Sequence, residues 1–303
     1  MGLNENQHTH LDFVLIANPI AGKGKAATVA VTTYQQLTAA GRNGELKFTE
    51  RQGDANLFAQ EVAETGGHLV IACGGDGTIH EIVNGIAEKP DMVLGVIPCG
   101  KGNDLPRALN IPMAPEKAVE VLLNGTTRQV DLGKIGERYF STIVTCGYDA
   151  EVSHRVAEEG TPFSGTAAYV YKAITTLFSY KSPVARIEGD FGAYEGEILL
   201  TATGITQAYG GGMKIVPDAV LDDGLFDVCI IKPVSNFTIL RMLITLFWGG
   251  HTFHPAVSIH RTRSMTIHTD PPTLLYADGE QIGHTPATIE MLERGLTVVA
   301  PPK

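Results

Sequence analysis

Residues 68–85 read HLVIACGGDGTIHEIVNG, and their hydrophobic pattern changes across a glycine-rich turn. The continuous apolar run 68–72 predicts a buried strand, and the pattern of 78–87 predicts a helix. Three glycines in four positions around Asp76 are more than a turn requires. Flexible backbone beside a carboxylate suits phosphates bound with a divalent cation, with Thr78 as a hydroxyl ligand or helix cap. An ordinary Asp-Gly turn is the alternative.

Short apolar runs and helical segments alternate on both sides of this stretch. Strands are predicted at 13–17, 45–50, 68–72 and 92–97, and helices at 25–40, 54–64, 78–87 and 115–123. Strands and helices at this spacing are typical of βαβ units and a largely parallel sheet, the α/β class. Ligands of such sheets bind in the loops that follow the carboxyl ends of the strands. We therefore expect the ligand site in the loops after three of these strands.

The first of these loops, NPIAGKGK, covers residues 18–25. Its glycines let backbone N–H groups approach an anion, and the next helix adds partial positive charge at its N-terminus. It is not a P-loop, because Ala17 stands where that motif needs glycine and Gly24 where it needs Ser or Thr. The spacing Gly22-x-Gly24-x-x-Ala27 matches the loose Rossmann fingerprint, and a tight turn with exposed lysines is the other interpretation.

The remaining loop, PCGKGND, covers residues 98–104 and follows the fourth predicted strand. All three loops therefore lie at the same end of the inferred sheet. Their convergence predicts a nucleotide phosphate site more strongly than any single motif does. Asp104 either contacts the ligand or caps the next turn, and both interpretations stay open. Glu81 and Asn84, three residues apart on one helix, are expected on the side that faces the cleft.

Beyond Asp131 the pattern changes to recurrent short β-rich runs interrupted by two helical segments. Strands are predicted at 139–145, 184–191, 197–203, 225–231, 256–260, 264–268 and 273–276, and helices at 165–180 and 235–248. Such runs are typical of a mainly antiparallel sandwich. We predict a nucleotide-binding α/β domain over 1–131 and a β-sandwich domain for the substrate over 132–303. The last few residues are free to return to the first domain.

Two acidic segments of the second half are candidate functional turns. The segment PDAVLDDGLFD, residues 217–227, contains a turn at Asp223-Gly224 that suits a hard cation bound through Asp223 and nearby carbonyls. A plain acidic β-turn is the alternative. The segment YADGE, residues 276–280, ends an apolar strand, and a carboxylate on such a tight turn can serve as general base for a hydroxyl. An ordinary hairpin is the alternative there.

Composition excludes several classes of protein. The 303 residues are 44% hydrophobic and 18% charged, which excludes an intrinsically disordered chain. The net charge of −10 has no basic half to bind a polyanion, so we expect no nucleic acid as partner. The start MGLNENQHTH lacks a signal-peptide pattern, the apolar stretch 239–248 is too short to span a bilayer, and the cysteines form no CxxC pair. These features predict a cytoplasmic protein.

The aromatic residues Phe163, Phe178 and Tyr180 favour buried helix packing over an exposed apolar surface.

Taken in order, the motifs resemble those of the lipid kinase family that includes bacterial diacylglycerol kinases and sphingosine kinases. The matching segments run from Asn18 to Glu280 and are NPIAGKG, GGDGTIHEIVNG, PCGKGNDLPRAL, PDAVLDDGLFDV and YADGE. GGDGT alone is shared with NAD kinases and phosphofructokinases, whereas its combination with NPxxGKG and the late DGE is more specific. The resemblance implies a nucleotide-binding α/β domain, a β-sandwich second domain and a cleft between them.

The resemblance also implies roles for individual residues. Glu280 would accept the proton of the lipid hydroxyl, and Asp76 would hold the catalytic Mg²⁺. A structural Mg²⁺ would be bound by Asp223 and by the carbonyls of Val220 and Leu225. ATP would contact the glycine loops and one threonine, namely Asn18, Pro19, Ile20, Ala21, Gly22, Thr49, Gly74, Gly75, Asp76, Gly77, Thr78, Ile79, His80, Glu81, Gly100, Lys101 and Gly102.

Two residues depart from the family pattern. Ala21 stands where the family often has Ser, which removes a hydroxyl, and Lys101 stands where Thr is usual, which adds a positive charge. Neither change removes the backbone donors. We therefore keep the implied activity and expect the two residues to affect nucleotide affinity.

The implied reaction transfers the γ-phosphoryl group of ATP to the hydroxyl of a membrane lipid, most often diacylglycerol, with Mg²⁺ as cofactor. Because the chain shows no anchor segment, we expect reversible membrane contact through an apolar rim of the second domain, and the family suggests a homodimer. The nearest alternative is an NAD kinase-like phosphotransferase with a soluble acceptor. A nucleotide-binding regulatory module without turnover and a Rossmann dehydrogenase are further alternatives. The joint presence of Asp76, Asp223 and Glu280 favours turnover, because a binding module needs no acceptor-side base.

Overall fold

The structure, a computed structural model, describes residues 12–163 and 165–302, and the polar start of the chain lies outside this part. The elements of the first lobe are β1 (Phe13–Ala17), α1 (Lys25–Ala39), β2 (Gly44–Phe48), α2 (Asp54–Glu64), β3 (Leu69–Gly74), α3 (Asp76–Ile86), β4 (Val93–Pro98), α4 (Asp104–Ala108) and α5 (Pro115–Asn124). Strands β2, β1, β3 and β4 pair in this order, and every pair is parallel. The predicted alternation of strands and helices around a parallel sheet is confirmed.

The burial of this sheet explains its sequence. All residues of β1 are buried, and in β3 and β4 all but the first are buried, which is why these strands are continuous apolar runs. The edge strand β2 is only partly buried. Gly75 is the single residue between the end of β3 and the start of helix α3. The carboxyl end of β3 and the N-terminus of α3 therefore form one tight corner.

The second lobe consists mainly of antiparallel strands, and its fold class is also confirmed. Its strands are β5 (Thr126–Ile135), β6 (Arg138–Phe140), β7 (Ile143–Gly147), β8 (Val184–Gly189), β9 (Gly192–Glu197), β10 (Leu200–Gly204), β11 (Phe226–Ile231), β12 (Val257–Thr262), β13 (Ser264–Asp270), β14 (Leu274–Ala277), β15 (Glu280–His284) and β16 (Ala287–Ala300). Its helices are α6 (Tyr148–Glu159), α7 (Thr166–Thr176) and α8 (Asn236–Thr245), followed by 3₁₀ turns at Leu246–Trp248 and Gly250–Phe253. One sheet has the order β12-β11-β10-β7-β14-β15 and is antiparallel throughout.

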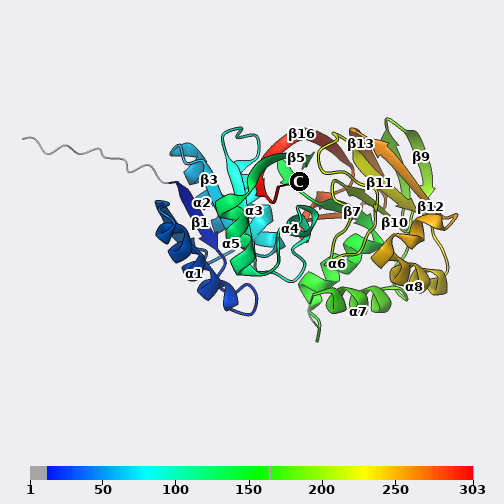
Figure 1. The fold of residues 1–303 in the computed structure, drawn as a ribbon. Coiled ribbons are helices and arrows are strands. Elements are labelled where there is room, and N and C mark those ends of the chain that lie inside the picture. The colour runs from blue at the N-terminus through cyan, green and yellow to red at the C-terminus, as the bar shows by residue number, and fades with distance from the viewer. Residues whose placement is uncertain (1–11, 164, 303) are drawn as a thin grey trace, which may run out of the picture.

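Strand β16 joins the two lobes into one continuous sheet. Its later part pairs in parallel with β4, with Thr297 opposite Val93, and its first part pairs antiparallel with β13. The full order of this sheet is β2-β1-β3-β4-β16-β13-β8-β9, with β5 also paired to β16. Figure 1 shows β16 and β5 between the lobes, with α1–α5 in one lobe and α6–α8 along one side of the other. The boundary predicted at residue 131 falls within β5, so the division into domains stays a prediction.

An apolar core extends through both lobes. One cluster of buried side chains includes residues of β1, β3 and β4 together with residues of β5, β13 and β16. Within it the rings of Phe140 and Phe226 stack with their centroids 5.9 Å apart. A second cluster, which includes Tyr148, Leu200 and Met242, lies between the antiparallel sheet and helices α6–α8. The shared core holds the loops of the first lobe in a defined position relative to the second.

The strand expected over 139–145 is instead two strands, β6 and β7. The chain breaks the ladder between them because the backbone N–H groups of Ser141 and Thr142 donate to the carboxylate of Asp278. Helix α6 and strands β5, β9, β15 and β16 are additional elements that the sequence patterns did not predict. The side chain of Phe178 is 81% exposed and that of Phe163 is 54% exposed, so the expectation of buried packing is wrong for these two residues.

Candidate functional site

The three glycine loops meet at the carboxyl ends of β1, β3 and β4. A Cβ atom added to Gly75 would lie 3.1 Å from the Cα of Gly100, so these two loops approach each other through glycines. A Cβ atom added to Gly22 would lie 2.8 Å from the carbonyl oxygen of Cys99. Gly22 also has a φ of +60°, which L side chains rarely adopt. Larger residues at these positions would force the loops apart.

A crevice of about 690 Å³ opens beside these loops, and we name it the glycine-loop crevice. It brings most of the residues expected to contact ATP together with Glu280, which comes from the other lobe. The residues that line it are Asn18, Pro19, Ile20, Ala21, Thr49, Glu50, Arg51, Gln52, Ala55, Gly75, Gly77, Thr78, Glu81 and Glu280. The crevice is therefore built at the ends of strands and the starts of helices, from small residues such as Gly75 and Gly77 together with polar and charged side chains such as Arg51 and Glu280.

The helices that begin beside the crevice are not equally available to an anion. The N-terminus of α2 is already capped, because the Glu81 carboxylate accepts hydrogen bonds from the N–H groups of Gly53, at 2.9 Å, and Ala55, at 3.1 Å. In the described part of the chain, no side chain hydrogen-bonds to the first N–H groups of α1 or α3, although the Ala26 N–H of α1 donates to the carbonyl of Ala21 at 3.3 Å. The partial positive charge of these two N-termini is thus directed at the glycine loops. Asn84, expected beside Glu81 at the cleft, instead exchanges two 2.9 Å hydrogen bonds with the backbone of Tyr139 in β6.

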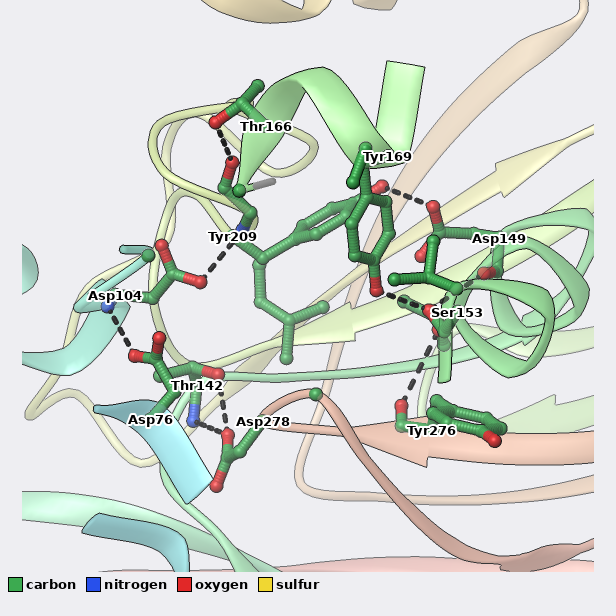
Figure 2. Close-up of a pocket in the computed structure, with 18 residues that line it drawn as sticks. Asp76, Asp104, Thr142, Asp149, Ser153, Thr166, Tyr169, Tyr209, Tyr276 and Asp278 are labelled. Carbon is green, nitrogen blue, oxygen red and sulfur yellow. Dashed lines mark hydrogen bonds between the residues drawn. The ribbon is translucent and has the colours of Figure 1, made fainter. Parts of the chain in front are cut away.

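A second cavity of about 210 Å³ lies between the lobes, and we name it the carboxylate cavity (Figure 2). Asp76 and Asp104 of the first lobe line it, together with Asp149 and Asp278 of the second. The other residues that line it are Gly102, Thr142, Ile143, Thr145, Ser153, Val156, Gly165, Thr166, Ala168, Tyr169, Tyr209, Gly210, Tyr276 and Gly279. The sequence motifs contain three of the four carboxylates, Asp76, Asp104 and the aspartate of the DGE turn, and Asp149 is the fourth.

The carboxylates of Asp76 and Asp104 link the lobes through backbone N–H groups. Asp76 accepts hydrogen bonds from the N–H groups of Asn103, at 2.9 Å, and Asp104, at 2.7 Å. Asp104 in turn accepts from Gly210, at 2.7 Å, and Gly211, at 2.9 Å. Burial raises the pKa of Asp76, and burial together with the nearby Asp76 raises the pKa of Asp104 to about 7. Asp104 therefore binds a loop of the second lobe instead of capping the next turn, and a ligand contact by this residue, which lines the cavity, stays a prediction.

Asp278 is a second link between the lobes. Its carboxylate accepts hydrogen bonds from the N–H groups of Ser141 and Thr142, each at 2.9 Å, and from the Thr142 hydroxyl at 2.5 Å. Nδ1 of His80 lies 3.1 Å from the same carboxylate, and Arg138 lies 3.3 Å from Nε2 of that ring. A neutral ring that donates through Nδ1 and accepts from Arg138 satisfies both contacts. Burial opposes ionisation of Asp278, but the bonds from His80, Thr142 and Ser141 outweigh it and lower its pKa.

The glycine-loop crevice and the carboxylate cavity meet at two short motifs. In the first, Gly75 and Gly77 line the crevice, whereas Asp76 between them lines the cavity. In the second, Gly279 lines the cavity and the next residue, Glu280, lines the crevice. The motifs touch, because a Cβ atom added to Gly77 would lie 3.0 Å from Oε1 of Glu280. The GGDGT and DGE motifs thus form a shared wall between two spaces.

An apolar chamber of about 50 Å³ adjoins the carboxylate cavity. Asp149, Tyr169 and Tyr209 line both spaces. The rest of the chamber is formed by helices α6–α8 and the antiparallel sheet, through Tyr148, Val152, Val170, Ala173, Leu199, Leu200, Met213, Ile215, Ile231, Ile239, Met242, Leu243, Leu246 and His251. A ligand that enters the carboxylate cavity therefore finds apolar surface beyond Asp149.

Some of the expected nucleotide contacts line neither the crevice nor the cavity. Ile79 is 2% exposed and belongs to the core, and His80 is bound to Asp278. The side chain of Lys101 lies beside the second lobe, where a Cβ atom added to Gly165 would be 3.4 Å from its Cβ. The described residues outside both spaces also include three loop glycines, Gly22, Gly74 and Gly100.

The turn expected to bind a structural Mg²⁺ holds a guanidinium group. Arg261 donates to one carboxylate oxygen of Asp223, and its Nε lies 3.5 Å from Asp227. The other oxygen of Asp223 accepts the N–H of Leu225 at 3.1 Å. In residues 12–163 and 165–302, no group of three or more His, Cys, Asp or Glu side chains is placed to hold a metal ion. The set Asp223, Val220 and Leu225 therefore does not fit a cation while Arg261 occupies the turn.

Asp76 differs from Asp223 in this respect. Its carboxylate lines the carboxylate cavity and pairs with backbone N–H groups instead of a cationic side chain. Mg²⁺ is commonly bound by one or two carboxylates together with substrate phosphates, not by an all-protein cage. Asp76 fits a metal that arrives with a phosphate ligand and does not by itself form a resident metal site.

Two functional features escaped the sequence patterns, Asp149 and the loop around Tyr209. The sequence signal of this loop is the run of three glycines, Gly210 to Gly212. In the structure all three have positive φ, at 59°, 82° and 121°, which glycine adopts readily. Asp149 had no local signal. It lies in a helix that was not predicted, and its partner Tyr209 is 60 residues away in the chain.

Comparisons with known proteins agree with this two-lobe arrangement. Residues 12–135 match the diacylglycerol kinase catalytic domain, and residues 142–300 match the YegS C-terminal NAD kinase beta sandwich-like domain. A diacylglycerol kinase of Staphylococcus aureus (strain MRSA252) is 38% identical over 289 residues, which cover 95% of this chain and 91% of the relative. A diacylglycerol kinase of Staphylococcus epidermidis (strain ATCC 35984) is 36% identical over 288 residues, with the same coverage.

Solved structures agree as well. The crystal structure of a diacylglycerol kinase from Bacillus anthracis str. Sterne has a TM-score of 0.78 and 28% sequence identity, covering 96% of this chain and 97% of that one. The resemblance inferred from the motifs is confirmed, and the chain belongs to the diacylglycerol kinase family.

Proposed function

We propose that this protein transfers the γ-phosphoryl group of ATP to the hydroxyl of a membrane lipid, with diacylglycerol as the first candidate acceptor. The observation that carries the proposal is the shared wall between the glycine-loop crevice and the carboxylate cavity. Gly77 and Glu280 lie on one side of that wall, and Asp76 and Gly279 lie on the other. A donor in the crevice and an acceptor in the cavity would meet there, which is the arrangement that direct transfer between two bound substrates requires.

The glycine-loop crevice suits the phosphates of the donor. The N-termini of α1 and α3 supply partial positive charge, and the glycines allow close approach of backbone N–H groups. Mg²⁺ bound with the nucleotide would offset the phosphate charge, with Asp76 as its protein ligand. Adenosine would lie toward Thr49 and Asn18, at the end of the crevice formed by β1 and β2.

The apolar chamber favours a lipid acceptor over NAD. NAD carries a pyrophosphate and two riboses, and these polar groups gain nothing from a space lined by residues such as Leu200, Ile215 and Met242. The first methylene groups of an acyl chain gain free energy when they leave water for such a space, which at about 50 Å³ admits the start of a chain. The arrangement of a polar cavity beside an apolar chamber suits a molecule with a hydroxyl headgroup and a hydrocarbon tail.

The outer surface of the same helices favours contact with a membrane. Helices α7 and α8 line the chamber with Ala173 and Met242, and they lie on one side of the second lobe (Figure 1). Every helix in the described part of the chain is too short or too polar to cross a bilayer. Reversible docking through exposed apolar side chains is the remaining route to a lipid substrate. On and after these helices, the exposed apolar side chains are Phe178, Phe237, Ile244, Trp248 and Phe253.

Glu280 is the proposed proton acceptor of the transfer. It reaches the shared wall from the second lobe and lies over Gly77, at the N-terminus of α3. The lipid oxygen forms a bond to the γ-phosphorus while the bond from that phosphorus to the β–γ bridging oxygen breaks. The hydroxyl proton passes to the Glu280 carboxylate, and ADP leaves with the bridging oxygen.

A turnover assay separates this proposal from its alternatives. The purified protein is incubated with γ-labelled ATP, Mg²⁺ and either mixed micelles of diacylglycerol or soluble NAD. Labelled phosphatidic acid supports the proposal. Labelled NADP without a lipid product would assign an NAD kinase-like activity, and ATP binding without phosphorylation of any lipid alcohol or NAD would assign a regulatory module.

A further inference from the structure

The carboxylate cavity has an unusual charge balance. Four aspartates line it, and no Lys, Arg or His side chain does. Only Asp278 has a side-chain partner that could carry positive charge, His80. In the described part of the chain, Asp76, Asp104 and Asp149 form no ion pair with a basic side chain. Because burial raises the pKa of Asp76 and, together with the nearby Asp76, raises that of Asp104 to about 7, the negative charge of this space at neutral pH comes mainly from Asp149 and Asp278.

Asp149 holds a special place among these carboxylates. Asp76 and Asp104 are engaged by backbone N–H groups near the loops, whereas Asp149 lies near the start of α6 and lines both the carboxylate cavity and the apolar chamber. Figure 2 shows its carboxylate at the hydroxyl end of Tyr209 and beside Tyr169, the two tyrosines that also line both spaces. A lipid that extends from the shared wall into the chamber must pass Asp149 with the part that joins its head to its chains.

The surroundings of Asp149 hold the carboxylate without neutralising it. The residue is 8% exposed, and its Oδ1 accepts the hydroxyl of Tyr209 at 3.0 Å. Burial raises the pKa of Asp149 to about 6, so the group remains largely ionised at neutral pH. Burial also raises the pKa of Tyr209 well above its ordinary value, so this hydroxyl remains a donor. A side-chain hydrogen bond from Thr145 also lowers the pKa of Asp149, whereas the nearby Tyr169 hydroxyl lies 2.5 Å from the oxygen of Ser153.

We propose that Asp149 selects the acceptor by headgroup charge, so that the protein phosphorylates uncharged lipid alcohols and rejects anionic ones. This inference rests on the proposed function and adds to it the class of lipid. An anionic headgroup placed between the shared wall and the chamber would lie close to the Asp149 carboxylate, which lines both spaces. Like charges in such a poorly hydrated space repel strongly, whereas an uncharged glycerol headgroup meets no such repulsion.

The test compares two acceptors with the same acyl chains, dioleoylglycerol and dioleoylphosphatidylglycerol. Each is presented in micelles of a nonionic detergent that contain the same fraction of dioleoylphosphatidic acid, which has no free hydroxyl, so that the surface charge stays nearly constant. The quantity measured is the ratio of kcat/KM for the uncharged acceptor to kcat/KM for the anionic acceptor. Because each variant is compared with itself, a general loss of activity cancels from this ratio.

Asp149→Asn removes the charge and keeps an oxygen that can accept from Tyr209. We expect it to reduce the ratio by about tenfold or more, as expected for removal of one nearby charge from a site of low hydration. The matched control is Tyr209→Phe, which removes the same hydrogen bond but leaves the carboxylate. We expect this control to lower kcat/KM for both acceptors and to leave the ratio within about twofold, since the charge is unchanged.

An unchanged ratio in Asp149→Asn, or an equal change in Tyr209→Phe, would overturn the inference. If Asp149→Asn does not fold, Asp149→Ser offers a smaller uncharged acceptor for Tyr209 and tests the same ratio. A wild-type protein that uses both lipids equally would refute selection by charge while supporting the lipid kinase activity. A wild-type protein that phosphorylates neither lipid would instead refute the proposed function, and the inference would fall with it.

Discussion

The glycine-loop crevice and the carboxylate cavity differ in how they are built. The crevice is formed by strand ends and helix N-termini of the first lobe, with Glu280 from the second lobe, and it combines glycine backbone with polar and charged side chains. The cavity is formed by side chains of both lobes, and carboxylates and tyrosines dominate it. Neighbours in the sequence are divided between them, with Asp76 on one side and Gly75 and Gly77 on the other. Under the proposed function, phosphoryl transfer takes place at the wall between the two spaces rather than within either one.

The largest effect is expected from Glu280→Gln, which changes the wall itself. The amide keeps the size of the side chain but cannot accept the hydroxyl proton, so we expect kcat to fall by about 10²–10⁴-fold. The measurement is the steady-state rate of lipid phosphorylation at saturating ATP, alongside the thermal unfolding midpoint. Glu290→Gln, at an exposed glutamate of β16, is the matched control and should retain wild-type turnover.

A different result would assign Glu280 a role other than proton acceptor at the wall. If Glu280→Gln raised KM for ATP and left kcat unchanged, the residue would belong to the donor crevice as a binding group. If turnover stayed near that of Glu290→Gln, it would have no part in the transfer. Either result would leave Asp76 as the carboxylate of the wall that faces the acceptor.

The second prediction disturbs the crevice alone. Gly75→Ala adds a Cβ atom that would lie 3.1 Å from the Cα of Gly100, so one loop must move. We expect KM for ATP to rise by about tenfold or more, because overpacking of a tight contact commonly costs about 1–3 kcal/mol, and KM for the lipid to change little. Gly283→Ala is the control, since a Cβ atom there meets nothing within 4 Å. Equal increases in both KM values would show that the two spaces are not separable.

The crevice was largely predictable from the sequence, and the reason is local. Each glycine loop follows an apolar run and precedes a helical segment, so the rule that parallel strands present their carboxyl ends at one edge is sufficient to bring Gly75 and Gly100 together. The wall needed more than this rule. Glu280 came from a short DGE motif by resemblance to a family, because its approach to Gly77 depends on the packing of the second lobe.

The cavity was not predictable because its contacts are long-range. Asp104 binds Gly210 and Gly211, more than a hundred positions away, and such a pairing leaves no periodic pattern. Strand β16 joins the lobes by pairing with β4 and β13, and the residues of β16 do not by themselves predict which strands it pairs with. At Asp223 the sequence predicted a site that the structure does not support. The acidic turn was predicted to bind a cation, but Asp223 is paired with Arg261 from another strand.

The third prediction sharpens the comparison from the acceptor side. Ala173→Leu adds three carbon atoms to the wall of the apolar chamber, where Ala173 is 8% exposed. We expect kcat/KM for dioleoylglycerol to fall by about fivefold relative to that for dihexanoylglycerol, because a longer chain needs the space that leucine fills. KM for ATP should not change. Ala167→Leu, at an exposed position of the same helix, is the control. A loss that is equal for both chain lengths would place the acyl chains outside the chamber.

The smallest effect is expected on the link between the lobes, measured as stability. The pKa of Asp104 is raised by burial and by the nearby Asp76, to about 7, so the folded protein binds this proton more tightly than the unfolded chain. The stability that the protonated form contributes is present below about pH 4 and is lost as the pH rises toward 7. Because Asp104 and Asp76 repel each other, the titration belongs to the pair.

Asp104→Asn removes this titration and keeps an oxygen for one of the glycine N–H groups. We expect the change in the free energy of unfolding between pH 5 and pH 8 to become smaller than in the wild type, by on the order of 1 kcal/mol. Denaturant unfolding at the two pH values measures it, with Asp91→Asn at an exposed aspartate as control. Equal pH dependence in wild type and Asp104→Asn would mean that the Asp104 carboxylate is already ionised at pH 5. The two glycine N–H groups would then stabilise the charge more than burial and Asp76 destabilise it, and the negative wall of the cavity would persist at acidic pH.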